Sequence, residues 1–300
     1  MRLFVTGGSG WIGSAVVPEL LDAGHSVLAL ARSEAAAAKV AGLGAEVLRG
    51  DVQDLDVLRS GAERTDGVVH LAFRHDLAFA GDFDTAVRTD RAVIDAIGTQ
   101  LAGTDRPFAV SSGLAAVHPG GLATESDRPE PFPGAGGRFA NERAALALAD
   151  RGVRAMCVRF APTVHGAGDG GFVARLVEAA RAHGVSAYPG EGAARWPAVH
   201  VGDAARAVRL AVEHAPAGSV LHAAAEEGVR VRALAEAIAG RLGVEARSLD
   251  TAEAEARFGV LGTFLGLDSP ASSAVTRELL GWEPSGPTLL QDVEAGAYTD

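Results

Sequence analysis

Three glycines at a fixed spacing near the start of the chain carry the clearest chemical signal in the sequence. Gly7, Gly10 and Gly13 follow a short apolar run, residues 3–5, and open a segment of helical periodicity that extends to about Ala23. The first glycine can take the positive φ of a tight turn, the second leaves room for a ligand, and the third lets the helix pack close to the strand. Because a helix N-terminus attracts anions, the pattern predicts a site for the pyrophosphate of a dinucleotide.

A positively charged residue stands where NAD-binding sequences usually carry an acidic one. The second predicted strand, residues 25–31, is followed by Arg32. An acidic side chain at this place binds the ribose 2′-hydroxyl of NAD, whereas a guanidinium pairs with the 2′-phosphate of NADP. We therefore expect NADP(H) in preference to NAD(H). The alternative is a surface arginine that merely ends the strand.

Polar side chains follow the fourth and fifth predicted strands. His75 and Asp76 come just after the fourth strand, and Ser112 comes at the end of the fifth. Since substrates bind outside the carboxyl ends of parallel strands, His75 is a candidate general acid whose pKa Asp76 could raise. Ser112 is a candidate ligand for a substrate oxygen. The alternatives are a solvated loop for the first pair and backbone capping for the serine.

Three ring-bearing residues later in the chain are candidates for contact with the substrate. His165 follows the sixth predicted strand, and Trp196 and His200 lie near the start of a later helix. A large aromatic such as Trp196 is also a common core residue. The nine histidines are scattered, without a His-x-x-x-His spacing or a second cysteine, so we expect no metal site.

These residues need a scaffold that brings several strand ends together. Apolar strands alternate with helical segments through the first half of the chain. The predicted strands are 3–5, 25–31, 45–49, 67–72, 107–111 and 154–159, and the helices between and after them include 34–43, 54–60, 82–101 and 138–150. This alternation predicts an α/β fold, a doubly wound parallel Rossmann sheet formed by residues 1–160. A loop rich in proline and glycine is expected at 113–137.

The pattern loosens in residues 161–300, which we expect to form a smaller lobe that covers the substrate and does not fold independently. The predicted elements of this half are helices 172–183, 202–214, 230–242, 252–258 and 272–280 and a strand at 219–223.

Composition narrows the classes of partner. A net charge of −11 disfavours nucleic acids and anionic membranes. Cys157 is the only cysteine, which excludes a disulfide within the chain and is typical of the reducing cytoplasm. No apolar run approaches the roughly 20 residues of a membrane helix. A cytoplasmic protein with a small-molecule substrate is expected, and a homodimer stays open.

Several motifs spread over the chain resemble those of the extended short-chain dehydrogenases/reductases, in the branch of NAD-dependent epimerases and dehydratases. They are Thr6-Gly7-Gly8-Ser9-Gly10-Trp11-Ile12-Gly13, Gly50-Asp51-Val52-Gln53-Asp54, His70-Leu71-Ala72, Ser111-Ser112, Val201-Gly202-Asp203-Ala204-Ala205 and Leu280-Gly281-Trp282-Glu283-Pro284. In the family, the aspartate at the position of Asp51 contacts adenine, and the strand that ends at Ala72 passes beneath the nicotinamide ribose.

Together, the resemblance and the motifs give a set of expected cofactor-binding residues. They are Thr6, Gly7, Gly10, Trp11, Ile12, Gly13, Arg32, Asp51, Val52, Leu71, Ala72, Phe73, Ser111 and Arg138. The expected catalytic residues are His75, Ser112 and Arg138, and the expected substrate-binding residues are His75, Asp76, Ser112, His165, Trp196 and His200.

The chain departs from the family at its proton-transfer residues. The family carries Tyr-x-x-x-Lys on the helix after strand five, but the only tyrosines here are Tyr188 and Tyr298. Alignment on the family glutamate, which falls on Glu142, puts Gly134 at the tyrosine and Arg138 at the lysine. A shifted register puts Phe139 and Arg143 there instead, and the family's catalytic Ser/Thr falls on Gly113. An arginine can hold the ribose, but it is no acid at neutral pH.

These features predict an atypical member of the family that acts as an NADP(H)-dependent reductase. Its substrate would be a small, uncharged or weakly polar carbonyl, imine or activated alkene, with His75, a serine or water handling the proton. Two alternatives stay open: an epimerase, dehydratase or lyase that retains NADP, and a non-catalytic NADP(H)-sensing protein.

Overall fold

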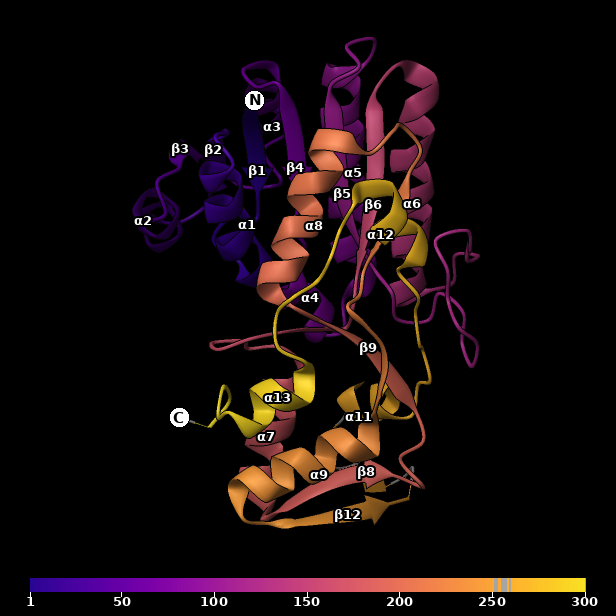
Figure 1. Cartoon of the computed structure of the whole chain (residues 1–300). Helices are drawn as coiled ribbons and strands as arrows, with labels where there is room; N and C mark the ends of the chain where they lie inside the picture. Colours follow the sequence, from indigo (N-terminus) through magenta and orange to yellow (C-terminus); the bar gives the residue numbers. More distant parts are fainter. Residues whose placement is uncertain (251–252, 255–257, 259, 300) are drawn as a thin grey trace.

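The computed structural model describes residues 1–250, 253–254, 258 and 260–299, and a seven-stranded parallel sheet lies at its centre (Figure 1). In spatial order its strands are β10 (Val220–Ala223), β6 (Arg154–Phe160), β5 (Pro107–Gly113), β4 (Gly67–His70), β1 (Arg2–Thr6), β2 (Ser26–Ala31) and β3 (Glu46–Arg49). The order reverses between β4 and β1, which is the place where doubly wound sheets bind their ligands. The predicted α/β Rossmann fold is confirmed.

Helices cover both faces of the sheet, so its strands are apolar on both sides. One face packs against α1 (Trp11–Asp22), α2 (Glu34–Gly42) and α8 (Val201–His214). The other face packs against α3 (Leu55–Glu63), α5 (Phe83–Leu101) and α6 (Gly137–Leu146). In α5, the buried side chains of Ile94, Ile97 and Leu101 recur at helical spacing, and the Asp82 carboxylate caps the helix by accepting from the Thr85 N–H at 3.1 Å.

A smaller lobe lies below the carboxyl ends of the large sheet (Figure 1). Its strands are β7 (Thr163–His165), β8 (Val185–Pro189), β9 (Arg195–His200), β11 (Glu226–Arg230) and β12 (Glu245–Leu249). Its helices are α7 (Phe172–His183), α9 (Val231–Leu242), α11 (Val260–Leu265) and α13 (Leu289–Glu294). The sequence pattern missed these strands and the two last helices, because each has only three to six residues and too few periods to stand out.

The second half of the chain contributes to both lobes. β10 pairs with β6, α8 packs against α1, and α12 (Ala274–Leu280) packs against β10. A division at residue 160 therefore splits the sequence but does not separate the lobes in space. The helix predicted over 252–258 falls largely outside the described residues. Within the described part of the chain, no helix is long and apolar enough to cross a membrane.

The predicted elements of the first half lie within a few residues of the observed ones, and the differences are small. β4 ends at His70, two residues early, and β5 continues to Gly113. A short helix that the pattern did not indicate, α4 (His75–Phe79), follows β4. The loop expected at 113–137 carries a single 3₁₀ turn at Gly134–Gly136, and a second 3₁₀ segment, Ala147–Arg151, continues α6.

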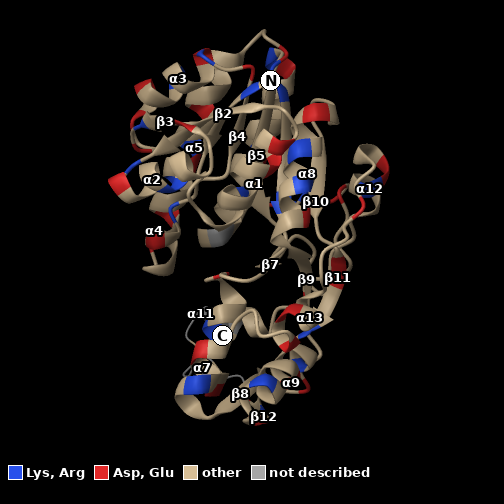
Figure 2. Cartoon of the chain, turned by 60° about the vertical axis from the view of Figure 1, so that its left-hand side comes forward, with Lys and Arg blue, Asp and Glu red and all other residues tan. Residues whose placement is uncertain are grey.

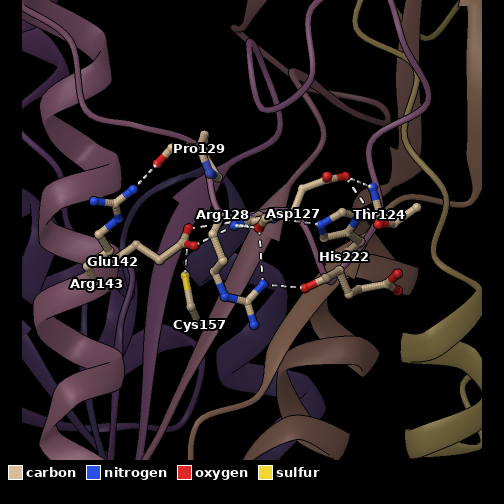
Figure 3. A network of polar contacts seen from close by, with 10 residues as sticks. Thr124, Asp127, Arg128, Pro129, Glu142, Arg143, Cys157 and His222 are labelled. Carbon is tan, nitrogen blue, oxygen red and sulfur yellow. Dashed lines mark hydrogen bonds and ion pairs between the residues drawn. The ribbon is translucent and has the colours of Figure 1, made fainter.

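A buried ion pair joins α6 to β6 (Figure 3). The Arg159 guanidinium donates to both carboxylate oxygens of Glu142, at 3.0 and 2.5 Å, and both side chains are almost completely buried. The Cys157 thiol lies 3.5 Å from the same carboxylate, and the pKa of this thiol is raised by burial. A third Arg159 donor reaches the Asp127 carbonyl at 2.8 Å, which fixes the long loop after β5.

His222 extends this network to β10 and the C-terminal segment. Its Nδ1 lies 2.7 Å from the Ser272 carbonyl, which can only accept, so Nδ1 carries the proton and Nε2 accepts from Arg159 at 3.2 Å. Burial lowers the pKa of this imidazole, in keeping with a neutral ring. One charged pair and one neutral ring therefore connect α6, β6, β10, the long loop and the C-terminal segment at Ser272.

The first testable prediction concerns this network. Glu142→Gln should lower the free energy of unfolding by about 3 kcal/mol or more, because it leaves the buried Arg159 charge uncompensated. Denaturant unfolding measures the effect. Glu130→Gln is the control, since its partner Arg143 is an exposed residue of the same helix, and it should change stability little. Equal stability of the two variants would contradict a structural role for the buried pair.

Candidate functional site

The glycine turn after β1 has the geometry that its sequence predicts. Gly7 has a φ of +74°, and a Cβ there would lie 2.7 Å from the Ala72 nitrogen and 2.9 Å from the Leu71 carbonyl carbon. A Cβ on Gly13 would lie 2.0 Å from the Gly7 oxygen, so only glycine allows α1 to pack this closely. A Cβ on Gly10 would meet only that oxygen, at 3.2 Å, and the space beyond it stays free for a ligand.

The N-terminus of α1 is an open anion site. Gly10 provides no side-chain cap, and the first turn, which contains Ile12, has no acidic residue, so helix N–H groups there lack a protein acceptor. These donors fit a pyrophosphate group. The Trp11 indole N–H donates to the Val164 carbonyl at 2.7 Å and thereby ties this turn to β7 of the small lobe.

Two cations come from the end of β2 and from α2. Arg32 is exposed at the end of β2, close enough for its charge to help keep the Asp76 carboxyl ionised. Lys39, the only lysine of the chain, extends from α2 and donates to the Ser9 carbonyl of the glycine turn at 2.9 Å. Sequence reasoning did not select Lys39, although its uniqueness was a signal. On the other side, the Asp51 carboxylate accepts from the Gln53 N–H at 3.0 Å and so shapes its own turn.

A small cavity opens beside the ends of β3 and β4. Val52, Ala72 and Phe73 line it, together with Arg74, Thr89, Asp90 and Val93. Three residues expected to bind the cofactor are therefore brought together around one hollow, next to the glycine turn.

A buried polar chain connects the glycine turn to α5 and α6. Thr6 Oγ1 is hydrogen-bonded to His70 Nδ1 at 2.6 Å, and His70 Nε2 to Asp90 Oδ1 at 3.1 Å. The Asn141 amide donates to the other oxygen of Asp90 at 2.7 Å. Burial raises the pKa of the Asp90 carboxyl, but the hydrogen bond and charge of His70 outweigh it and hold that pKa below its usual value. These side chains are buried, so their hydrogen bonds fix the ends of the strands from inside the fold.

At the end of β5, two hydrogen-bond donors have no partner. The Arg138 guanidinium donates to the Ser111 carbonyl at 3.0 Å and lies over the Phe73 ring, 4.4 Å from its centroid. Its Nε and the Ser112 hydroxyl are buried and form no hydrogen bond in the described part of the chain. Buried polar groups of this kind are rare unless a ligand or water satisfies them.

The structure decides between the two sequence registers of α6. Arg138 reaches the end of β5, whereas Arg143 pairs with exposed Glu130 at 2.8 Å. Phe139 is buried in a separate apolar cluster. The position of Arg138 favours the register in which Gly134 corresponds to the family's tyrosine. A Cβ built on Gly134 or on Gly113 meets no atom within 4 Å, so no other side chain occupies either position.

His75 lies on α4 between two phenylalanines. Its ring centroid is 5.1 Å from that of Phe73 and 5.8 Å from that of Phe79. The Asp76 charge raises the pKa of His75 as expected, but desolvation and then the Arg138 charge outweigh it, so that this pKa lies below its ordinary value. The Asp76 carboxylate also pairs with Arg74 at 2.8 Å, and this bond lowers the pKa of Asp76 to about 2.

The structure does not place Trp196, His165 and His200 beside His75 and Ser112 at the ends of β4 and β5. Trp196 is 2% exposed in the small-lobe core, where its indole N–H donates to the Phe264 carbonyl at 3.2 Å, so it offers no wall to a substrate. His165 is fully buried and bonds Asp292 at 2.6 Å, and burial lowers its pKa. His200 caps α8 by accepting from the Gly202 N–H at 3.2 Å. Core packing accounts for Trp196 and helix capping for His200, whereas His165 Nε2 is buried and has no hydrogen-bond partner among the described residues.

No group of three or more His, Cys, Asp or Glu side chains in the described ranges is arranged to hold a metal ion. The site is therefore built from a glycine turn, a cation pair, unpartnered donors and aromatic rings. Its spacing suits a dinucleotide beside the sheet and a small substrate at the ends of β4 and β5.

Comparisons with known proteins agree with this geometry. Residues 3–234 match the model of the NAD dependent epimerase/dehydratase family. An uncharacterized protein of Schizosaccharomyces pombe is 45% identical over 99% of this chain and 100% of its own length. A 2-alkyl-3-oxoalkanoate reductase of Stenotrophomonas maltophilia is 30% identical over 71% of this chain and 66% of that protein.

Among solved structures, a dTDP-glucose 4,6-dehydratase from Streptomyces venezuelae with NAD bound has the same fold. Its TM-score is 0.77 at 21% identity, with 99% of this chain and 96% of that chain covered. The fold, the glycine turn and the family match lead to one assignment. The chain belongs to the NAD-dependent epimerase/dehydratase family and is an NAD(P)-dependent enzyme of the extended short-chain dehydrogenase/reductase type.

Proposed function

We propose that this enzyme is an NADP(H)-dependent reductase of small organic carbonyls, imines or activated alkenes. The observation that carries the proposal is the pair of unpartnered donors, Arg138 Nε–H and the Ser112 hydroxyl, beside the open positions Gly113 and Gly134. Donors left free at the end of β5 suit a substrate oxygen or nitrogen that enters from outside.

The residues present fit a dinucleotide. The turn of Gly7, Gly10 and Gly13 and the N–H groups of α1 would hold the pyrophosphate, and Arg32 and Lys39 would bind the 2′-phosphate. The bound cofactor supplies a hydride, so that one hydride and one proton reduce the substrate. Two cations near the adenosine end favour NADP(H) over NAD(H).

The protein's own contribution is polarisation and proton supply. Arg138 stays charged at every working pH, so its Nε–H and the Ser112 hydroxyl can stabilise the negative charge that develops on the reacting atom. His75 supplies a proton only while it is protonated, and its lowered pKa restricts this to acidic pH. Above that range water takes the role, which suits a substrate that needs little acid catalysis.

The two alternatives fit less well. An epimerase or dehydratase that retains its cofactor needs a base to start the cycle, and a glycine stands at the tyrosine position. A protein that only senses NADP(H) has no use for buried donors aimed past the cofactor. The 2-alkyl-3-oxoalkanoate reductase, a relative that reduces a carbonyl by its name, supports the reductase reading.

Cofactor preference gives the second testable prediction. NADPH should bind at least tenfold more tightly than NADH, and Arg32→Ala should remove most of the difference, because one charge-assisted contact contributes about 1.5–3 kcal/mol. Titration of both cofactors into both proteins measures this. Arg59→Ala, which removes an exposed arginine of α3, should leave both affinities unchanged. Equal affinities in the wild type would end the NADP assignment.

The third prediction tests the reaction itself. A screen of small ketones, imines and enones should find oxidation of NADPH, and on the best substrate Arg138→Met should lower kcat/KM about 100-fold, since it removes a donor to the developing charge. Arg143→Met, on the same helix, should have little effect. If NADPH binds tightly and none of these classes of substrate oxidises it, the NADP(H)-sensing alternative takes precedence.

The fourth prediction concerns the proton. An acid acts in its protonated form, so a His75-dependent rate falls as pH rises through its pKa, which lies below the ordinary 6.5. His75→Asn should therefore lose about 100-fold in turnover at acidic pH and approach the wild type above neutrality. A pH–rate profile of both proteins, with His118→Asn as control, checks this. A constant ratio at all pH values would exclude His75 as the donor.

A further inference from the structure

Two arginines, one in each lobe, flank a row of aromatic rings. Arg138 lies 4.4 Å from the centroid of the Phe73 ring, and Arg175 lies 4.2 Å from that of Phe79. The His75 ring stands between the two phenylalanines, within 6 Å of each. The row runs from α6 through α4 to α7, and Figures 1 and 2 show α4 and α7 on the same side of the molecule, one in each lobe. It therefore bridges the large lobe and the small lobe.

Arg138 donates to the Ser111 carbonyl and keeps an unpartnered Nε–H, and Arg175 has no side-chain hydrogen bond within the described part of the chain. A guanidinium that stacks on a ring uses its flat face, while its donors point outward in the plane. In the part of the chain that the structure describes, neither Arg138 nor Arg175 has a carboxylate partner, whereas Arg74, Arg143 and Arg209 are ion-paired. Arg277 also stacks on a ring without a carboxylate partner, but its donors are used by Ser273 and the Ala225 carbonyl.

The rings between the arginines offer an apolar surface. Phe79 is 47% exposed although Arg175 lies over it. A ligand that binds Arg175 through a carboxylate can lay its hydrocarbon part along Phe79 and His75. Arg138, whose Nε–H has no partner in the described part of the chain, lies at the other end of this row, over Phe73.

We infer that the substrate is a carboxylic acid whose carbonyl or activated alkene is separated from the carboxylate by an apolar spacer, and that Arg175 binds the carboxylate. The inference rests on the proposed reductase function and names its substrate class. Reduction of an oxo acid consumes one NADPH and one proton and gives the hydroxy acid and NADP⁺, while the carboxylate is unchanged. This substrate is more polar than the sequence alone suggested.

A matched pair of probes tests the inference, 4-acetylbenzoate and its methyl ester. The wild type in the presence of NADP⁺ should bind the acid at least tenfold more tightly than the ester, because a bidentate guanidinium–carboxylate contact is charge-assisted. With NADPH, the acid should show the same preference in kcat/KM. Arg175→Gln should remove the preference through a higher Kd and KM for the acid, and Arg175→Lys should keep part of it.

Arg232→Gln is the matched control. Arg232 also stacks on a ring in the small lobe, 5.7 Å from the Tyr188 centroid, but it is paired with Glu236. This variant should keep the wild-type preference. Equal binding of acid and ester by the wild type, binding of neither, or a preference that survives in Arg175→Gln would overturn the inference. Selective binding of the acid without oxidation of NADPH, by acid or ester, would overturn the reductase proposal and leave the carboxylate site standing.

Discussion

A buried positive charge constrains how several elements of this structure pack together. Arg159 lies inside the fold, and the carboxylate of Glu142 must meet it there, because an unpaired charge at this depth would cost several kcal/mol. The pair fixes the position of α6 against β6. Arg138 stands one turn before Glu142 on the same face of the helix, so the same pair brings it to the end of β5.

The site that results is unusual for what it leaves open. In the register that Arg138 favours, Gly113 and Gly134 take the positions of the family's hydroxyl-bearing residues, and no atom of the described residues lies within 4 Å of a Cβ built on either glycine. Arg138 Nε and the Ser112 hydroxyl are buried and have no hydrogen-bond partner among the described residues. Under the proposed reductase function, the substrate would occupy this space and accept these hydrogen bonds, which suits a substrate that is already easy to reduce.

Motifs far from the glycine turn hold the lobes together. The Asp203 carboxylate accepts from the backbone N–H groups of Ser285 and Gly286 at 3.1 and 2.8 Å, and the Trp282 indole donates to the Asp203 carbonyl at 3.1 Å. Two motifs some 80 residues apart in the sequence are thus partners in one contact. Trp11 adds a second tie, from the glycine turn to β7.

The sequence by itself determined the Rossmann half and its glycine turn, because strand periodicity and the steric needs of Gly7 and Gly13 are local. It left two registers for α6, and only the tertiary structure decided for Arg138, since the choice depends on which helix face meets Glu142's partner. The burial of Trp196 and the lowered pKa of His75 could not be predicted from the sequence either. Burial and desolvation arise from residues distant in sequence, and the stacking of Arg175 on Phe79 exists only once both lobes are folded together.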